Sequence, residues 1–218
     1  MRITKLGHAC VRIEHEGTTI VLDPGAFTDP DAVDGADAVL VTHEHADHYV
    51  AETLRRADAP VHTIEGVAAH VRADAPDLAE RLHVVAPGED FTIGPIAVRA
   101  VGELHAVIHP ELPRITNSGY LLDLGGHKVF HPGDALTGPG EPIDLLLLPV
   151  SAPWLKAAEA IDFAREVGAP RNLAIHDRIY SETGLGVIGG HLDRFLEPTG
   201  QVYTRLADGQ DLQDLQDV

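Results

Sequence analysis

Directly after the apolar stretch Ala38-Val39-Leu40-Val41-Thr42, the chain continues with His43-Glu44-His45-Ala46-Asp47-His48. The apolar stretch predicts a buried strand, and the six residues behind it hold four side chains that commonly ligate metals. In an extended or loosely turning segment, residues two apart project to the same side, so His43 and His45 can bind one cation while Asp47 and His48 reach another. We therefore expect a metal site whose loop serves two ions.

The alternative for this run is a solvated polar loop behind a strand, which would explain a lone pair of histidines. Three imidazoles and two carboxylates this close together would repel one another or compete for protons unless a cation organised them. Imidazole and carboxylate form the ligand set that suits zinc, iron or manganese. The density of these groups favours the metal site.

Length and composition indicate one globular unit. The 218 residues, 44% of them hydrophobic, suffice for the core of a single sandwich-type α/β domain that spans residues 1–218. The last residues, 208–218, are acidic and lack a periodic face, which predicts a short frayed tail. The chain opens on a strand-like pattern instead of a signal peptide, and no stretch approaches a membrane span. These features predict a soluble cytoplasmic protein.

The charge balance limits the partners. Thirty-four acidic against 16 basic residues give a formal charge of -18, so the surface repels phosphate backbones and anionic membranes. Two bound divalent cations would offset only about four units of this charge. We expect a small-molecule substrate, and neither nucleic acid nor a membrane, as the partner; self-association as a homo-oligomer is left open.

Apolar periodicity and turn formers predict alternating strands and helices. Strands are expected at 2–6, 10–14, 18–22, 38–42, 61–64, 91–102, 119–124, 128–131, 143–148 and 172–175. Helical segments are expected at 50–56, 66–72, 77–82 and 156–167. Each half of the chain has a β-rich block followed by helix and strand, which suggests two sheets packed face to face with helices outside.

Three further residues of the ligating kind follow predicted strands. His105 comes after the strand that ends near Gly102, Asp134 closes the run His131-Pro132-Gly133-Asp134, and His176 follows the strand at 172–175. In a chain with 14 histidines, each of these residues alone is a weak signal. Their order along the chain, taken together with the run at 43–48, is more specific.

That order and spacing resemble the metallo-β-lactamase superfamily over nearly the whole chain. The resemblance implies an α/β fold, a four-layer αββα sandwich, with a two-metal site. It places His43, His45, His105 and Asp134 on the first metal, and Asp47, His48, Asp134 and His176 on the second. The implied cofactors are two divalent metal ions, with zinc foremost and manganese or iron as alternatives.

The resemblance also implies metal-dependent hydrolysis, in which a water or hydroxide that bridges the two ions attacks the substrate. Catalytic roles are expected for Asp134, which bridges the metals, and for Asp47, which can receive the proton of the water. The expected substrate is a small polar or anionic ester, lactone or phosphodiester. The alternative is a catalytically idle metal-binding or regulatory protein on the same fold, which the complete ligand set disfavours.

Three stretches are similar to a narrower branch, that of ascorbate-6-phosphate lactonase-like proteins and N-acyl phosphatidylethanolamine phospholipase D: Leu6-Gly7-His8-Ala9-Cys10, Leu22-Asp23-Pro24 and Gly133-Asp134. True β-lactamases of this fold lack a bridging aspartate and often use a late cysteine ligand, and its diiron oxygen reductases carry glutamate where this chain has His45. Lactam hydrolysis and oxygen reduction are therefore disfavoured.

Substrate-binding residues are expected in the irregular segment 107–117, because loops beside a ligand often carry specificity. Arg114 is expected to hold an anionic substrate group with its forked guanidinium, the alternative being a surface salt bridge. His109 is a second candidate. His8 is expected near the metals, where it touches substrate or orients a ligand, with a hydrogen-bonded core histidine as the alternative. For Trp154, simple packing is favoured.

Overall fold

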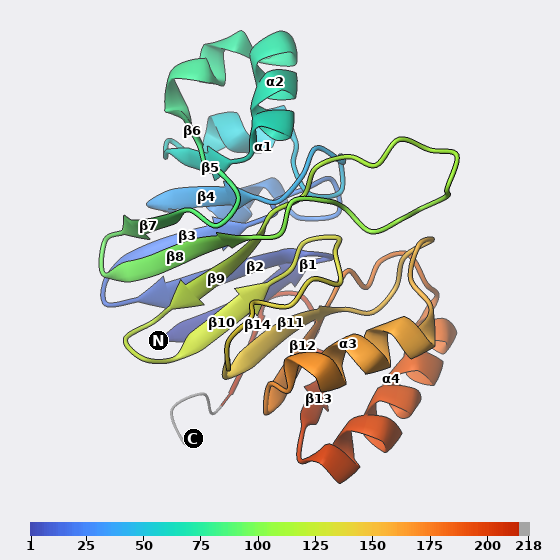
Figure 1. Ribbon diagram of the computed structural model, residues 1–218. Coiled ribbons are helices and arrows are strands. Elements are labelled where there is room, and N and C mark those ends of the chain that lie inside the picture. The colour runs from blue at the N-terminus through green and yellow to red at the C-terminus, as the bar shows by residue number, and fades with distance from the viewer. Residues whose placement is uncertain (214–218) are drawn as a thin grey trace.

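The computed structural model describes residues 1–213, which contain two seven-stranded sheets packed face to face (Figure 1). Helices α1 and α2 lie outside one sheet, and α3 and α4 cover the other (Figure 1). The chain therefore forms the four-layer αββα arrangement that the sequence predicts, because each sheet buries one face against its partner and the other against helices.

The first sheet has the strand order β14-β1-β2-β3-β4-β5-β6. Its strands are β1 (Arg2–Gly7), β2 (Cys10–His15), β3 (Thr18–Leu22), β4 (Ala38–Val41), β5 (Val61–Thr63), β6 (Leu82–Val84) and β14 (Gln210–Asp211). β1, β2 and β3 form the predicted antiparallel meander, whereas β3 to β6 pair in parallel. The carboxyl ends of β1, β3 and β4 therefore meet at one edge of the sheet.

The second sheet repeats this plan with the order β13-β12-β11-β10-β9-β8-β7. Its strands are β7 (Asp90–Ile93), β8 (Ile96–Val101), β9 (Gly119–Asp123), β10 (Lys128–His131), β11 (Leu145–Pro149), β12 (Arg171–Ile175) and β13 (Val202–Thr204). Pairing is antiparallel from β7 to β10 and parallel from β10 to β13. This pattern brings the carboxyl ends of β8, β10 and β12 to a common edge.

Four α-helices and three short 3-10 helices complete the described residues: α1 (Ala51–Arg56), α2 (Glu65–Asp74), α3 (Ala157–Val167), α4 (Glu182–Leu196), η1 (Pro30–Val33), η2 (Pro76–Arg81) and η3 (Glu197–Thr199). The predicted apolar stripe of α3 is buried at Ala160, Ile161 and Ala164. Gly168 ends this helix with a left-handed backbone, φ 70°, which glycine adopts without strain. Within residues 1–213, no helix is both long and apolar enough to cross a membrane.

Two apolar cores hold the layers together. The larger one joins residues of both sheets, such as Ile13, Val41 and Leu122, with Leu54 of α1. The second fills the space between the other sheet and α3 and α4, where Phe163 is buried. Burial of this apolar surface, worth about 25 cal/mol per Å², is the main force that fixes the sheets relative to each other.

Helix α4 is the largest element that the sequence analysis does not predict. Its four glycines, at 184, 186, 189 and 190, lower the intrinsic helix propensity by about 1 kcal/mol each relative to alanine. Tertiary packing overrides this cost, because Leu185, Ile188, Leu192 and Leu196 are buried along one stripe. Ser181 caps the helix by accepting the backbone N–H of Gly184 at 3.2 Å.

The helical segment expected at 77–82 is the 3-10 helix η2, which ends at Arg81 because Leu82 already begins β6. One other expectation needs correction. The predicted frayed tail at 208–218 is wrong for its first part, since β14 pairs with β1 and Asp208 accepts a hydrogen bond from the buried Lys5 at 3.0 Å. This strand could not be predicted from apolar alternation because its residues are polar, and it is held mainly by backbone hydrogen bonds and ion pairs. The end of the predicted tail, 214–218, lies outside the described residues.

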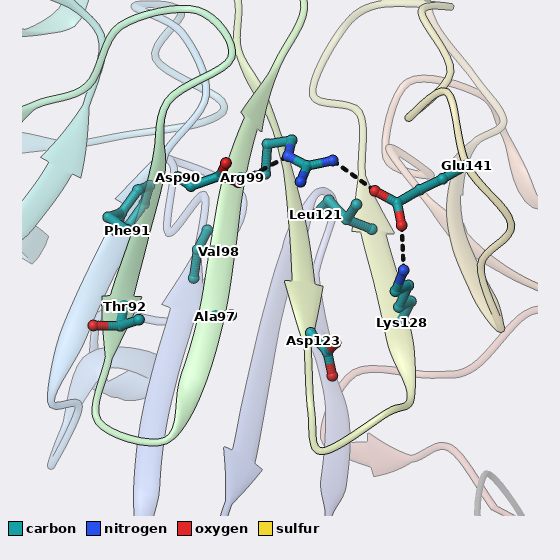
Figure 2. A pocket seen from close by; sticks show the side chains of 10 residues that line it. All are labelled: Asp90, Phe91, Thr92, Ala97, Val98, Arg99, Leu121, Asp123, Lys128 and Glu141. Carbon is teal, nitrogen blue, oxygen red and sulfur yellow. Dashed lines mark hydrogen bonds and ion pairs between the residues drawn. The ribbon is translucent and has the colours of Figure 1, made fainter.

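A shallow pocket on the outer face of β7 to β10 is lined by charged and apolar side chains (Figure 2). Arg99 contacts Asp90 at 2.8 Å and Glu141 at 2.6 Å, and Lys128 also pairs with Glu141. These cations and carboxylates neutralise one another at the surface. None of the predicted metal ligands lines this pocket, which belongs to a different face from the site described next.

Candidate metal centre

The ligand-type side chains stand on loops that leave the two sheets at the shared edge. His8 follows β1, Asp23 follows β3, the run 43–48 follows β4, and His105, Asp134 and His176 follow β8, β10 and β12. All seven metal ligands predicted from the sequence lie here. The packing of the sheets therefore brings together predicted ligands that lie up to 133 positions apart in the sequence, from His43 to His176.

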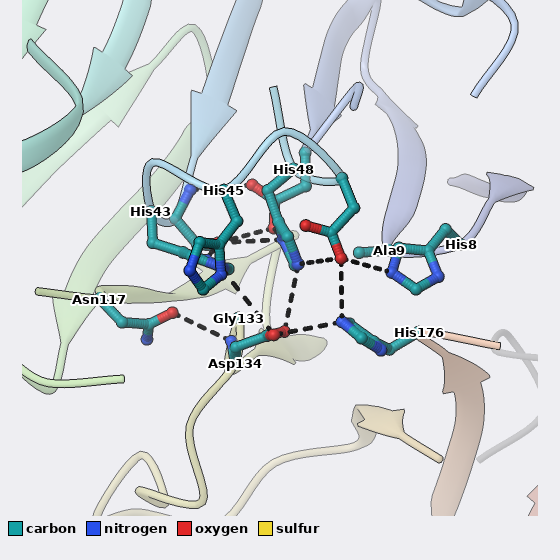
Figure 3. Close-up of polar contacts among 12 residues, drawn as sticks. His8, Ala9, His43, His45, His48, Asn117, Gly133, Asp134 and His176 are labelled. Carbon is teal, nitrogen blue, oxygen red and sulfur yellow. Dashed lines mark hydrogen bonds and ion pairs between the residues drawn. The ribbon is translucent and has the colours of Figure 1, made fainter. Parts of the chain in front are cut away.

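The first group consists of His43, His45, His105 and Asp134, which each place one ligand atom within 4.8 Å of the others. Nε2 of His43 lies 3.0 Å from Nδ1 of His45 (Figure 3). Nε2 of His105 lies 3.4 Å from Oδ2 of Asp134. Three imidazole nitrogens and one carboxylate oxygen match the ligand set of a zinc-type ion.

The second group consists of His8, Asp47, His48 and His176, again with ligand atoms within 4.8 Å of one another. Oδ2 of Asp47 is 3.5 Å from Nε2 of His176 and 3.9 Å from Nε2 of His48. His8 enters this group with Nε2 at 3.1 Å from the same carboxylate oxygen. The sequence predicted His8 near the metals, either in contact with substrate or orienting a ligand, with a hydrogen-bonded core histidine as the alternative.

Asp134 faces both groups. Its Oδ1 lies 3.2 Å from Nε2 of His48, and its Oδ2 lies 3.1 Å from Nε2 of His176 (Figure 3). The same Oδ2 lies 3.4 Å from Nε2 of His105 in the first group. The backbone N–H of Asp134 donates to the buried Asn117 side chain at 3.0 Å. The Asp134 carboxylate therefore lies between the two groups and contacts both.

Trp154 also contacts this carboxylate. Its indole N–H donates to Oδ2 of Asp134 at 3.0 Å, and its ring lies edge-on to His105 and His176. The expectation of simple packing is therefore incomplete, because this tryptophan orients a predicted ligand. No local pattern in the sequence indicates the contact, which spans 20 residues between two loops.

The outer nitrogen of each buried ligand histidine faces a hydrogen-bond acceptor. Nδ1 of His43 lies 3.0 Å from the Thr42 hydroxyl, Nδ1 of His48 lies 2.7 Å from Asp23, and Nδ1 of His105 lies 2.7 Å from the Ala106 carbonyl. Nδ1 of His176 likewise faces the Ser151 carbonyl at 2.5 Å. A proton on Nδ1 leaves a lone pair on Nε2, so these partners select the tautomer that can bind a cation.

Asp23 is the functional residue whose role the sequence analysis missed. This fully buried carboxylate accepts the Thr42 N–H at 2.8 Å, the Thr42 hydroxyl at 2.7 Å and Nδ1–H of His48 at 2.7 Å. Asp23 has a left-handed backbone, φ 47°, which is uncommon for residues other than glycine but least so for Asp and Asn. Asp23 could have been found from the pairing of the strands: β3 and β4 are parallel neighbours, so the residue after β3 lies beside the ligand run after β4.

Charges within the centre shift several pKa values. Burial opposes charge on His48, but the Asp134 and Asp23 carboxylates raise the pKa of this histidine well above its usual value. Burial likewise opposes charge on His176, yet Asp134 raises its pKa to about 9. Burial by itself would raise the pKa of Asp134, which the neighbouring His48 and His176 hold well below its usual value. In the metal-free protein, protons on these histidines balance the carboxylates.

The residues present fit divalent cations. Among the described residues, Nε2 of His48, His105 and His176 and Oδ1 of Asp134 are buried without a hydrogen bond. Buried polar atoms normally have a partner, and these four atoms belong to the two converging groups. Cations would satisfy them and would replace the balancing protons.

The predicted substrate residues differ in placement. Arg114 is exposed, and its Nε–H donates to the carbonyl of His105 at 2.7 Å, so the arginine stands beside the first group. His109 is exposed near the tip of the same loop and accepts the Glu111 N–H at 3.2 Å. Both residues are accessible, and their substrate roles stay predictions.

Comparison with known proteins places the chain in a family. Residues 2–176 match the family model described as the beta-lactamase superfamily domain, which covers well over half of the sequence. The protein therefore belongs to the metallo-β-lactamase superfamily, as the order of its ligand residues indicated.

Three known proteins illustrate the likeness. Protein Rv0786c of Mycobacterium tuberculosis is 38% identical over 208 residues, covering 93% of this chain and 96% of its own. The UPF0173 metal-dependent hydrolase of Carboxydothermus hydrogenoformans is 30% identical over 166 residues, which cover 69% of this chain and 72% of that protein. The structure of Igni18, a metallo hydrolase from the archaeon Ignicoccus hospitalis, superimposes with a TM-score of 0.73 over 97% of both chains at 16% identity, which shows the shared fold.

Proposed function

We propose that this protein is a metal-dependent hydrolase that works with two divalent ions. The observation that carries the proposal is the position of Asp134, whose Oδ2 faces His105 of the first group and His176 of the second, while its Oδ1 faces His48 of the second. His43, His45 and His105 would hold the first ion, and Asp47, His48 and His176 the second, with Asp134 shared. Zinc is the first expectation, and manganese or iron also suits imidazole and carboxylate ligands.

Bound divalent ions supply a nucleophilic water near neutral pH and polarise the oxygen of the bond to be cleaved. The remaining work falls to the chain. Asp134 fixes the distance between the two groups, and Asp47, whose side chain is 23% exposed, can accept the proton that the attacking water loses. The acceptors on the outer nitrogens of His43, His48, His105 and His176 keep these ligands in one tautomer throughout.

The proposed substrate is a small polar or anionic ester, lactone or phosphodiester. Arg114 supports this choice, because an exposed guanidinium beside the first ligand group can pair with a substrate anion. The protein is strongly acidic overall, so its surface repels anions. Arg114 would therefore favour substrates whose anionic group reaches this arginine while the bond to be cleaved reaches the metal centre. The lactonase-like and phosphodiesterase-like branch suggested by the sequence supplies the first substrates to try.

The test combines metal content with turnover. The purified protein, loaded with Zn²⁺ or Mn²⁺, is analysed by inductively coupled plasma mass spectrometry and assayed on a γ-lactone, a p-nitrophenyl ester and bis(p-nitrophenyl) phosphate. We expect about two metal equivalents and chelator-sensitive hydrolysis of at least one substrate. Two bound metals without turnover of any substrate would favour the catalytically idle alternative, and a single equivalent that cannot be raised would refute the two-ion proposal.

A further inference from the structure

His8 lies in the second ligand group, and its ligand-type nitrogen is as close to the other members as theirs are to one another. Distance alone would make it a fourth ligand of the second ion. The ring is buried at 0% exposure, so the side chain has no access to solvent that could supply alternative partners. Its hydrogen-bond partners therefore decide what it can do.

The partner of Nδ1 separates His8 from the ligand histidines. The backbone N–H of Arg178 points at Nδ1 of His8 at 3.2 Å. A backbone N–H can only donate, so Nδ1 must present its lone pair. The neutral ring then carries its proton on Nε2, which lies 3.1 Å from Oδ2 of Asp47. The Asp47 carboxylate accepts this hydrogen bond.

The contrast holds for the four buried ligand histidines. His43, His48, His105 and His176 each turn Nδ1 toward an acceptor, which leaves the lone pair on Nε2 for a cation. His8 turns Nδ1 toward a donor, which places a hydrogen on Nε2. A cation on Nε2 of His8 would require the Nδ1 proton to face the Arg178 N–H, two donors 3.2 Å apart.

Backbone contacts keep the His8 ring in place. The N–H of His176 donates to the carbonyl of His8 at 2.9 Å, and the two rings lie 3.9 Å apart between centroids. Phe27 contacts the ring edge-on with centroids 5.1 Å apart. His8 and His176 both adopt a left-handed backbone, with φ of 46° and 56°. Such conformations in residues other than glycine are retained where the surrounding structure demands them, often at functional sites.

We propose that His8 is a positioning residue, a fixed hydrogen-bond donor to Asp47, and not a metal ligand. It ties the loop after β4, which carries Asp47, to the loop after β12, which carries His176 and Arg178. The donor holds Oδ2 of Asp47 beside His176 and leaves the other carboxylate oxygen free of His8. The effect on catalysis rests on the proposed function, whereas the tautomer of His8 is independent of it.

The direct test is the tautomer of His8. Protein labelled with ¹⁵N-histidine is examined by long-range ¹H–¹⁵N correlation near neutral pH, and the His8 signals are assigned by their loss in His8→Gln. We expect the pattern of a ring protonated on Nε2, in the metal-free and the metal-loaded protein alike. A ring protonated on Nδ1, or a metal-induced shift of Nε2, would overturn the inference. This readout needs no turnover, so a protein without hydrolase activity still decides it.

Two substitutions test the consequence. In His8→Gln the side-chain amide can still donate near the position of Nε2, whereas His8→Leu removes the donor at similar volume. We expect both variants to bind as many metal equivalents as the parent protein, with kcat lowered about 10- to 100-fold in His8→Leu and largely restored in His8→Gln. His176→Gln serves as the ligand control and should lose one equivalent.

Loss of a metal equivalent in His8→Gln, as in His176→Gln, would show that His8 is a ligand. Circular dichroism and thermal unfolding confirm that each variant folds. Should His8→Leu fail to fold, His8→Gln and the tautomer measurement still decide between donor and ligand. If no substrate is turned over by any form, the proposed function fails while the metal count and the tautomer continue to test the inference.

Discussion

Replacing Asp23 by asparagine should weaken the second metal position without touching any ligand. Asp23 accepts three hydrogen bonds, from the Thr42 N–H, the Thr42 hydroxyl and Nδ1–H of His48. The side-chain oxygen of asparagine can keep the bond to the Thr42 N–H. In that orientation the NH₂ group of the asparagine faces the Thr42 hydroxyl and Nδ1 of His48. Because an NH₂ group only donates, Nδ1 of His48 must present a lone pair, and the ring proton moves to Nε2.

The magnitude follows from that tautomer change. Loss of a partner that orients a metal-bound histidine typically weakens metal binding 10- to 100-fold, about 1.4 to 2.8 kcal/mol. We also expect the metal-free protein to lose about 2 kcal/mol of unfolding free energy, because two of the three hydrogen bonds to the buried carboxylate, worth ~1.5 to 3 kcal/mol each, are replaced by bonds to a neutral amide, worth about 0.5 to 1.5 kcal/mol each. The left-handed backbone at Asp23 adds little strain, because asparagine tolerates it nearly as well.

The assay is a Zn²⁺ titration in competition with a chromophoric chelator, which resolves the two equivalents, together with urea unfolding of the metal-free protein. One equivalent should weaken by the stated factor and the other by less. Asp144→Asn is the matched control, because Asp144 accepts a backbone N–H from Lys128 at 2.7 Å away from the centre. If both equivalents bind in Asp23→Asn as tightly as in the control, the tautomer argument is refuted.

Three further predictions concern the same centre. Asp134→Ala should keep the fold by circular dichroism, abolish most hydrolysis and weaken at least one metal equivalent; near-parental turnover with two metals bound would exclude a bridging role. Although burial opposes charge on His176, Asp134 raises its pKa from the usual 6.5 to about 9, so the metal-free protein should be stabilised by this pair fully below pH 6.5. That stability should be lost as pH rises through about 9. Metal affinity should increase over the same pH interval, because metal binding releases the proton of His176. Urea unfolding and metal titrations at several pH values measure the two effects, and pH-independent stability and affinity would show that the pKa shift is absent. Arg114→Ala should raise KM for an anionic substrate about tenfold or more, the equivalent of a charge-assisted bond worth ~1.5 to 3 kcal/mol, and that for a neutral analogue much less; equal effects on both would exclude the anchor role.

The chemistry of the centre could be predicted from the sequence because it is written locally. The run His43-Glu44-His45-Ala46-Asp47-His48 behind a buried strand fixes the ligand types, and the alternation of strands and helices fixes the layers. Helix α4 could not be predicted in the same way, because its glycines lower the local helix propensity. The burial of its apolar stripe against the sheet and α3 stabilises the helix only in the folded protein. Local propensity is a weak signal where tertiary burial contributes more.

The sequence by itself thus determined the kind of site and the loops that carry it, because ligand identity and strand periodicity are properties of neighbouring residues. Only the tertiary structure decided how those residues work together. Asp23 reaches His48 across 25 positions, and His8 reaches Asp47 across 39 and Arg178 across 170. Whether a buried imidazole meets a donor or an acceptor sets its tautomer, and that partner is supplied by the packing of two sheets, which no spacing along the chain reveals.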